Sequence, residues 1–319
     1  MHKILALSPK SLNLYQDWLK FFDKLGQPSG LFFANFPNPW IPTFLQHLEA
    51  LDLSEWDDWD KKKVLEYFSY LKNNKCLVPM NQKFDYESSW ELNYSHLPDE
   101  KKRECIAIGE RKNSFGIKDF RSLNPLELKA PSYHAGSLSP DELVKLLSIY
   151  FLQTKKIAFV DRHNYLFDSL NRPSRFANFI QAILRLTSTV ELGEILIYAQ
   201  FDHKHAYMRS EASLRDALFS CFSDSKLPLY GIKYVCCEEI RDPCIGNLHT
   251  RLICTNHAVF QLGDSIPGRN NSQLITRIPD SYESSTNLTY WIDGDHSLKV
   301  ITEAILLTDR KIQEPVSIK

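Results

Sequence analysis

The sequence lacks any apolar stretch approaching the roughly 18 residues that a membrane-spanning helix needs. It also lacks an excess of charge of one sign, since 38 Lys and Arg stand against 39 Asp and Glu, which excludes a protein that is basic throughout and coats nucleic acid. Eleven glycines and 16 prolines are too few for a fibrous or low-complexity chain. The apolar patch at the start is short, and we do not expect it to act as a signal peptide.

Cysteine is present, but the pattern of a disulfide framework is missing. There are seven cysteines, an odd number, and no two of them form a Cys-x-x-Cys pair. This usage is typical of reduced thiols that serve as small core residues, and it predicts a cytoplasmic protein. With 43% hydrophobic residues, the composition is that of a soluble globular chain with a large core.

Residues 1–135 contain helical patterns and no motif that carries chemistry. Apolar residues recur at spacings of three and four over 9–25 and again over 60–73, where Asp60 is a candidate N-cap. A third helix is expected from about Pro42. The sequence therefore predicts a mostly helical first domain. Its tryptophans are expected to be either core residues or anchors of an interface with a partner protein; they are Trp40, Trp56, Trp59 and Trp90.

Residues 136–319 alternate between strand and helix patterns, which is typical of βαβ units on a partly parallel sheet. The first helix, over 137–153, begins with the favourable pair Ser139 and Pro140. The predicted strands are 155–161, 194–201, 230–240, 249–256 and 258–266, and the other predicted helices are 175–188, 210–225 and 296–313. The predicted fold class is therefore α/β, with a helical first domain and a mixed-sheet α/β second domain.

The stretch from Leu248 to Ile266 carries the most specific pattern in the chain. His249, Arg251, Asn256 and Gly263 follow one another as His-x-Arg-x4-Asn-x6-Gly. This pattern resembles the signature of the phospholipase D-like superfamily, His-x-Lys-x4-Asp-x6-Gly-Ser-x-Asn. The spacing agrees from the histidine to the glycine, and the alternation of strands and helices before it agrees with the family's α/β layout. The resemblance covers roughly residues 150–300.

The resemblance implies phosphodiester chemistry without a metal or cofactor. His249 would attack phosphorus as the nucleophile, and Arg251 would bind the same phosphate, because residues two apart on a strand share a face. Asn256 would orient or polarise the site, and Gly263 and Ser265 would contact the substrate. The chain holds one copy of the motif, so a two-fold homodimer is one way to complete the site.

Four motif positions depart from the family pattern. Arg251 stands in place of lysine, Asn256 in place of aspartate, Asp264 in place of serine and Ile266 in place of the last asparagine. Two functions therefore stay open. The first is a nuclease, a hydrolase of DNA or RNA, and the second is a catalytically inactive subunit that binds nucleic acid or a protein partner. The layout of residues 1–135 resembles that of bacterial proteins from defence and mobile-element clusters, which implies a role in an antiphage defence complex.

Further polar residues follow two of the predicted strands. Asp161 comes directly after the apolar run of the first predicted strand, 155–161. His203 and His205 follow the second predicted strand, 194–201. Because parallel strands end at the same edge of a sheet, we expect these three residues to bind substrate beside the His249 motif. Asp202, His203 and His205 also have the side chains of metal ligands. The spacing of the sequence shows no further ligand to complete a site with the two histidines, and a polar loop is the favoured alternative.

Overall fold

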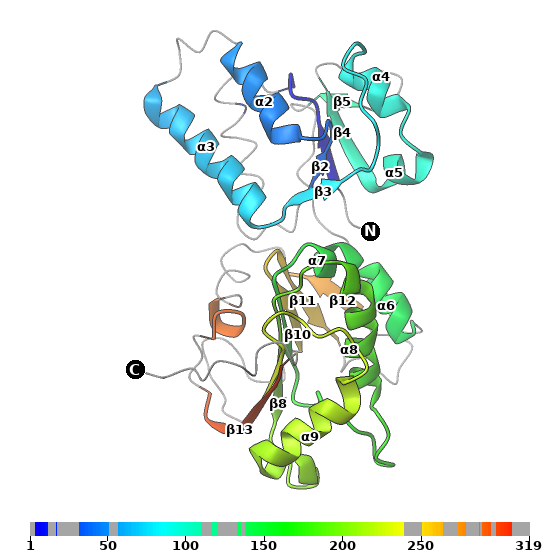
Figure 1. Ribbon diagram of the computed structural model, residues 1–319, viewed down its shortest axis with the longest axis vertical. Helices are drawn as coiled ribbons and strands as arrows, with labels where there is room; N and C mark the ends of the chain where they lie inside the picture. The colour runs from blue at the N-terminus through cyan, green and yellow to red at the C-terminus, as the bar shows by residue number, and fades with distance from the viewer. Residues whose placement is uncertain are drawn as a thin grey trace. The chain divides into compact units, whose positions relative to one another are not determined.

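The computed structural model describes residues 4–11, 17, 32–50, 57–109, 117–119, 133–134, 138–238, 251–263, 274–278, 287, 289–294 and 298–307. The chain divides into two compact units, Met1–Ala130 and Pro131–Lys319, which is close to the boundary predicted after residue 135. Each unit contains a β-sheet of its own (Figure 1). The α/β fold class predicted from the sequence is therefore confirmed.

The first unit contains helices, as predicted, but it is built on a parallel sheet that the prediction of a mostly helical domain did not include. Its five strands run in the order β3-β2-β1-β4-β5 and every neighbouring pair is parallel. The strands are β1 (Ile4–Leu7), β2 (Phe32–Asn35), β3 (Leu77–Pro79), β4 (Cys105–Gly109) and β5 (Lys118–Asp119). The central strands are short and buried on both faces, so they lack the apolar–polar alternation by which a strand is recognised in a sequence.

Helices also contribute to the first unit: α2 (Trp40–Glu49), α3 (Asp58–Asn73), α4 (Trp90–Ser95) and α5 (Asp99–Glu104). Helix α3 begins two residues earlier than predicted, because the Asp57 side chain accepts the backbone N–H of Asp60 and is the N-cap. Trp40 is buried, and its Nε1 donates to the carbonyl oxygen of Leu7 at 2.8 Å, so this tryptophan belongs to the core. The helix predicted over 9–25 lies almost entirely outside the described residues.

The second unit contains an eight-stranded mixed sheet in the order β13-β9-β8-β7-β10-β11-β12-β6. Strands β7, β8 and β9 are parallel to one another, and the remaining pairs are antiparallel. The strands are β6 (Tyr133–His134), β7 (Lys156–Val160), β8 (Glu194–Gln200), β9 (Ile232–Cys237), β10 (Leu252–Thr255), β11 (Ala258–Leu262), β12 (Leu274–Arg277) and β13 (Val300–Leu306).

Helices cover one face of this sheet (Figure 1). They are α6 (Pro140–Leu146), α7 (Ser148–Leu152), α8 (Arg175–Leu186) and α9 (Glu211–Phe222), joined by the short 3-10 turns η3 (Thr187–Thr189) and η4 (Ala206–Arg209). Serine side chains cap α6, α8 and α9 at their first turns, as the sequence indicates for Ser139 and Ser210. On this face, Phe159 of β7 packs against Phe176 of α8 at a ring distance of 5.7 Å.

The opposite face of the sheet packs against the segment around Trp291. The Trp291 and Tyr198 rings lie 5.1 Å apart, and the Tyr198 hydroxyl donates to the carbonyl oxygen of Trp291 at 3.1 Å. Burial of both faces explains why β7, β8 and β9 are apolar runs that the sequence identifies readily. Among the described residues, no helix is long and apolar enough to span a membrane.

The final helix predicted over 296–313 is wrong where the structure describes it. Residues Val300–Leu306 form β13, which pairs antiparallel with β9 and places Ala304 opposite Tyr234. The apolar spacing of this segment suits a helix as well as a strand, and pairing with β9 decides in favour of the strand. Residues 308–313 of the predicted helix lie outside the described residues.

Candidate functional site

The carboxyl ends of β7, β8 and β9 gather at one edge of the second sheet, because the three strands are parallel. Strand β10 runs antiparallel to β7, with Leu252 opposite Val160. The residue before β10 and the residue after β7 therefore meet at this edge. These residues are Arg251 and Asp161, so the sheet brings together two groups that are far apart in the sequence.

Arg251 and Asp161 form a close, largely buried pair of opposite charges. The Nε of Arg251 lies 4.0 Å from Oδ1 of Asp161. The exposed fraction of the side chain is 22% for Arg251 and 2% for Asp161. Arg251 Nη1 also donates to the carbonyl oxygen of Gly263 at 3.0 Å. Gly263 follows β11 and lies beside Arg251, because β11 pairs antiparallel with β10. Three of the predicted site residues, Asp161, Arg251 and Gly263, therefore lie together.

The backbone at Arg251 differs from the strand predicted there. Strand β10 begins at Leu252, and Arg251 has a φ of +49°, in the left-handed region that non-glycine residues rarely adopt. The alternation of side chains along a strand therefore does not set the direction of Arg251. Contacts with Asp161 and Gly263 hold the side chain instead. The predicted nucleophile His249 and the predicted substrate contact Ser265 lie outside the described residues.

Asn256 does not belong to the same site, which corrects the role predicted for it. It follows β10 at the end opposite Arg251. Five residues of extended chain separate the two positions, which corresponds to about 16 Å along the strand. Its Oδ1 accepts hydrogen bonds from the Thr154 hydroxyl at 2.8 Å and from the backbone N–H groups of Lys155 and Lys156 at 2.9 Å each. Asn256 therefore holds the start of β7 and has a structural function at the other edge of the sheet.

The Asp161 carboxylate also organises the loop that follows β7. Its Oδ1 accepts the backbone N–H of His163 at 3.0 Å. Its Oδ2 is buried and has no hydrogen-bond partner among the described residues. A buried carboxylate is stabilised chiefly by a neighbouring cation when its hydrogen bonds are incomplete. The guanidinium of Arg251 supplies that charge, so the two side chains depend on each other.

Imidazole and phenol rings line the loops after β7 and β8. The Tyr165 and His205 rings lie 4.1 Å apart, which joins the two loops, and the His163 and Tyr165 rings lie 5.7 Å apart. Burial and the nearby Asp202 carboxylate raise the pKa of Tyr165 to about 12, and burial lowers the pKa of His205. We call Asp161, His163, Tyr165, His205 and Arg251 the rim cluster.

His203 and His205 have separate surroundings. The exposed His203 ring packs against Phe201 at 4.8 Å, whereas the His205 ring lies on Tyr165. Asp202 accepts the backbone N–H of Lys204 through Oδ1 and that of His205 through its carbonyl, so it shapes the loop. In the part of the chain that the structure describes, no three His, Cys, Asp or Glu residues are grouped so as to hold a metal ion.

A buried hydrogen-bond network supports the rim cluster from beneath, and the sequence analysis did not identify it. The Tyr234 hydroxyl donates to the carbonyl oxygen of Asn164 at 2.6 Å, and Asn164 Nδ2 donates to the carbonyl oxygen of Tyr198 at 3.1 Å. The Tyr207 hydroxyl accepts the backbone N–H of Leu166 at 3.0 Å. Tyrosines inside otherwise apolar strands are the signal in the sequence, since a buried hydroxyl needs a partner.

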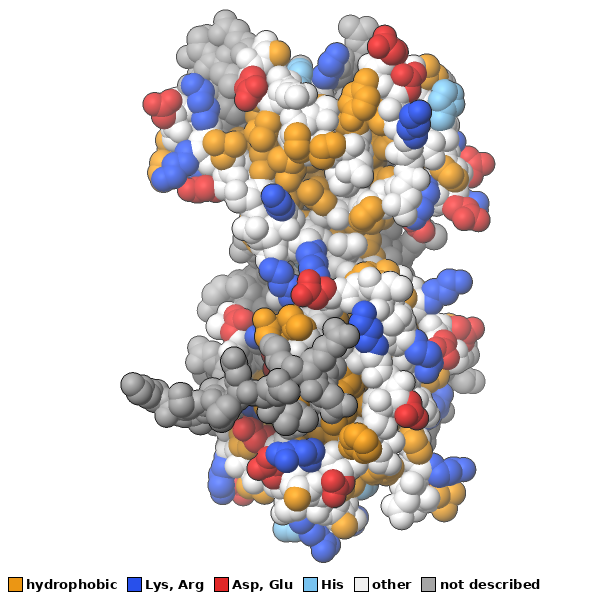
Figure 2. All heavy atoms as spheres, in the orientation of Figure 1, with side chains coloured by type: hydrophobic (Ala, Val, Ile, Leu, Met, Phe, Trp, Pro, Cys, Tyr) orange, Lys and Arg blue, Asp and Glu red, His pale blue; other side chains and the backbone are white. Residues whose placement is uncertain are grey.

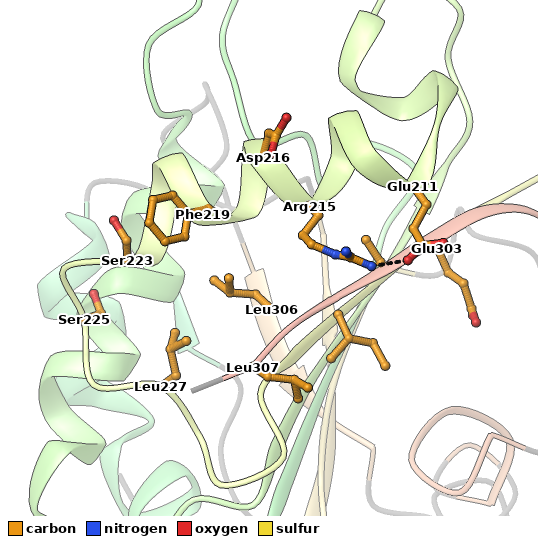
Figure 3. Close-up of a pocket in the computed structure, with 12 residues that line it drawn as sticks. Glu211, Arg215, Asp216, Phe219, Ser223, Ser225, Leu227, Glu303, Leu306 and Leu307 are labelled. Carbon is orange, nitrogen blue, oxygen red and sulfur yellow. Dashed lines mark hydrogen bonds and ion pairs between the residues drawn. The ribbon is translucent and has the colours of Figure 1, made fainter. Parts of the chain in front are cut away.

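A hollow of about 840 Å³ lies elsewhere in the second unit, between α9 and β13 (Figure 3). Apolar side chains such as Phe219 and Leu306 line it together with Arg215, which forms an ion pair with Glu211 along α9. None of the predicted site residues lines this hollow. Its position, at the outer strand of the sheet, separates it from the rim cluster.

Cysteines do not supply a nucleophile among the described residues. The six that the structure describes are free and buried. Burial raises the pKa of Cys236 and of Cys237 to about 12, which keeps both thiols protonated and unreactive near neutral pH. The interpretation of the cysteines as small core residues agrees with this burial.

Comparison with known proteins adds no family: no protein-family model matches the chain, and no curated protein is similar to it. The site therefore has to be interpreted from its own residues. Its chemistry is that of a guanidinium and several imidazoles beside a buried carboxylate, at the edge where α/β sheets bind their ligands.

Proposed function

We propose that the second unit acts on phosphodiester bonds of nucleic acid, with the rim cluster as part of its site. The observation that carries this proposal is the position of Arg251, beside Asp161 and Gly263 at the carboxyl edge of β7, β8 and β9. A guanidinium is the side chain best suited to bind a phosphate through paired hydrogen bonds. The side chain keeps 22% of its exposure, so part of it is accessible to a ligand.

In the proposed reaction His249 is the nucleophile, as the resemblance to the phospholipase D-like superfamily implies. An imidazole nitrogen of His249 forms a bond to phosphorus while the bond from phosphorus to the leaving oxygen breaks. The leaving oxygen takes up a proton, for which the rim cluster offers the imidazoles His163 and His205. Water then cleaves the phosphorus–nitrogen bond and releases the second product. Arg251 balances the charge of the phosphate throughout.

A binding protein without catalytic activity is the second candidate. The observation that favours it is the position of Asn256, which accepts a hydrogen bond from Thr154 at the end of β10 opposite Arg251. In this alternative the rim cluster binds nucleic acid or a protein partner within an antiphage defence complex. On the face drawn in Figure 2, the Lys and Arg side chains of the described residues are interspersed with Asp and Glu.

The test is incubation of the purified full chain with single- and double-stranded DNA and RNA in EDTA. We expect cleavage by the wild type, loss of cleavage but not of binding in His249→Ala, and weaker binding in Arg251→Gln. Arg185→Gln is the matched control, because Arg185 forms an exposed ion pair with Asp141 away from the rim. This control should cleave and bind as the wild type does.

The outcomes separate the two candidates. Cleavage that continues in EDTA and depends on His249 supports the nuclease. Binding that depends on Arg251, without cleavage by the wild type, supports the binding protein. Binding and cleavage that are both unaffected by Arg251→Gln would contradict the assignment of the rim cluster in either candidate.

A homodimer and a cytoplasmic defence complex remain part of the proposal. One copy of the His-x-Arg motif is present in the chain, and a two-fold dimer would supply the second imidazole. Sedimentation of the full chain with and without an oligonucleotide measures this directly, and a chain that cleaves as a monomer excludes the dimer as a requirement.

A further inference from the structure

Histidine and tyrosine rings gather on the loops after β7 and β8, at the sheet edge where Arg251 lies. His163 and His203 are exposed, and Tyr165, His205 and Tyr207 are partly buried behind them. Ring contacts connect four of these side chains, at 5.7 Å for His163 and Tyr165, 4.1 Å for Tyr165 and His205, and 5.5 Å for His205 and Tyr207, whereas the His203 ring contacts Phe201. The metal-free reaction proposed above uses only the imidazoles as acids or bases, so it does not explain the tyrosines.

The structure holds these rings in place before any ligand binds. The Tyr207 hydroxyl accepts the backbone N–H of Leu166, which fastens the loop after β8 to the loop after β7. Arg162 Nε donates to His163 Nε2 at 2.8 Å, which fixes the imidazole and keeps a guanidinium beside it. Rings that are already ordered lose little entropy when a flat ligand stacks on them.

Cations follow the same two loops. Arg162 precedes His163, Lys204 lies between the two histidines of the second loop, and Arg209 donates to the carbonyl oxygen of His203 at 2.9 Å. Strands β10, β7 and β8 are neighbours about 4.8 Å apart, so the end of β10 that carries Arg251 and the carboxyl end of β8 lie about 10 Å from one another. A ligand that carries both phosphates and flat rings matches this arrangement.

We propose that the ligand at this edge is single-stranded nucleic acid, with an unpaired base stacked on the rings around His163 while Arg251 binds a neighbouring phosphate. In a duplex both faces of a base are covered by adjacent bases, so only an unpaired base offers a face to a protein ring. Stacking on aromatic or imidazole rings with cations alongside is the usual chemistry of single-strand recognition. The inference rests on the proposed function for its phosphate contact only.

The test measures binding of a labelled single-stranded oligonucleotide and of its duplex to the full chain by fluorescence anisotropy in EDTA. Both are measured in the His249→Ala background, so that cleavage does not remove the probe. The variants are His163→Ala, His163→Phe and Arg251→Gln. Tyr230→Ala is the control, because this exposed tyrosine precedes β9 at the opposite edge of the sheet.

We expect tighter binding to the single strand than to the duplex. His163→Ala should weaken binding of the single strand at least about fivefold, and His163→Phe should restore most of it, because stacking needs a ring and no charge. Neither change should alter the dependence of affinity on salt. Arg251→Gln should reduce the slope of that dependence by about 0.7, as expected for one lost phosphate contact. Tyr230→Ala should bind as the parent does.

Two results overturn this inference. One is equal or tighter binding of the duplex, and the other is equal loss in His163→Ala and His163→Phe, which would show that a polar group rather than a ring makes the contact. Failure of the proposed function is distinguishable from either. If the protein binds a single strand through the rings but does not cleave it, only the proposed nuclease activity is contradicted. If the protein cleaves and prefers duplex, only the inference of a single-stranded ligand is contradicted.

Discussion

Arg251 and Asp161 are joined at the sheet edge, with Nε of the arginine 4.0 Å from Oδ1 of the aspartate. The antiparallel pairing of β10 with β7 creates this contact, since Leu252 lies opposite Val160. The pair links the segment that carries the His-x-Arg motif to the loop of imidazole and phenol rings. Each partner lowers the electrostatic cost of burying the other.

Replacing Asp161 with asparagine should destabilise the second unit. The Asp161 side chain is almost fully buried, and the change leaves the Arg251 charge without its counter-charge while preserving shape. We expect the free energy of unfolding to fall by about 1–3 kcal/mol, less than for a fully buried pair because Arg251 is partly exposed. Urea denaturation followed by circular dichroism measures the change.

The control for this prediction is Asp141→Asn, which breaks an exposed ion pair with Arg185 and should change stability by less than about 1 kcal/mol. The double variant of Asp161→Asn with Arg251→Gln should lose less than the sum of the two single losses. Strictly additive losses would mean that the two side chains do not stabilise each other.

Asn256→Ala should reduce stability without affecting the site. The Asn256 Oδ1 accepts three hydrogen bonds around the start of β7, from Thr154, Lys155 and Lys156. Their loss leaves backbone donors without an acceptor, and we expect a decrease of about 1–3 kcal/mol in the free energy of unfolding. Asn256→Asp keeps the acceptor oxygens and should lose less. Nucleic-acid binding by the folded fraction should be unchanged in both variants. A loss of binding at unchanged stability would show that Asn256 belongs to the binding site.

Tyr234→Phe should loosen the loop beneath the rim cluster. The buried Tyr234 hydroxyl donates to the carbonyl oxygen of Asn164, and its removal leaves that acceptor without this bond. We expect a loss of about 1–2 kcal/mol in the free energy of unfolding. Faster hydrogen exchange should be confined to residues 161–166. Tyr230→Phe changes an exposed tyrosine and should have little effect, so equal losses in the two variants would contradict the importance of the network.

The stability of the protein should depend on pH through His205. Burial lowers the pKa of His205 below the 6.5 of an unperturbed imidazole, so the folded protein binds this proton less readily than the unfolded chain does. The stability contributed by the neutral ring is therefore complete above about pH 6.5 and is lost as the pH falls through the lowered pKa.

His205→Phe keeps a ring on Tyr165 and cannot be protonated, so it should lose less stability than the wild type between pH 7.5 and pH 5.5. Above pH 7.5 the two stability curves should run parallel. Urea denaturation across this range makes the comparison, and curves that stay parallel down to pH 5.5 would show that His205 does not contribute.

Local patterns in the sequence predicted the elements that are defined by their own residues. Strands β7, β8 and β9 are apolar runs, and the helices between them are amphipathic and begin at serine caps, as with Ser210 before α9. The first sheet could not be recognised in this way, because strands such as Cys105–Gly109 are short and buried throughout. Residues 300–306 suit either a helix or a strand, and only pairing with β9 decides between them.

The candidate site shows the same division. Asp161, His203 and His205 could be placed at the ends of strands because parallel strands end together. The partner of each side chain could not be predicted, because it comes from a remote part of the chain. Asn256 illustrates this. The spacing of the motif predicts that Asn256 is a site residue, whereas its hydrogen bond with Thr154 indicates a structural function.

The sequence by itself determined the α/β class, the order of strands and helices from α6 to β11 in the second unit, and the types of side chain available for phosphate chemistry. Only the tertiary structure decided which of these side chains meet. Strand pairing is set by contacts between distant segments, so the position of β10 beside β7 brings Arg251 to Asp161 and carries Asn256 to the opposite edge. Local sequence patterns contain no information about such contacts, because the physical interactions that form them act across the whole sheet.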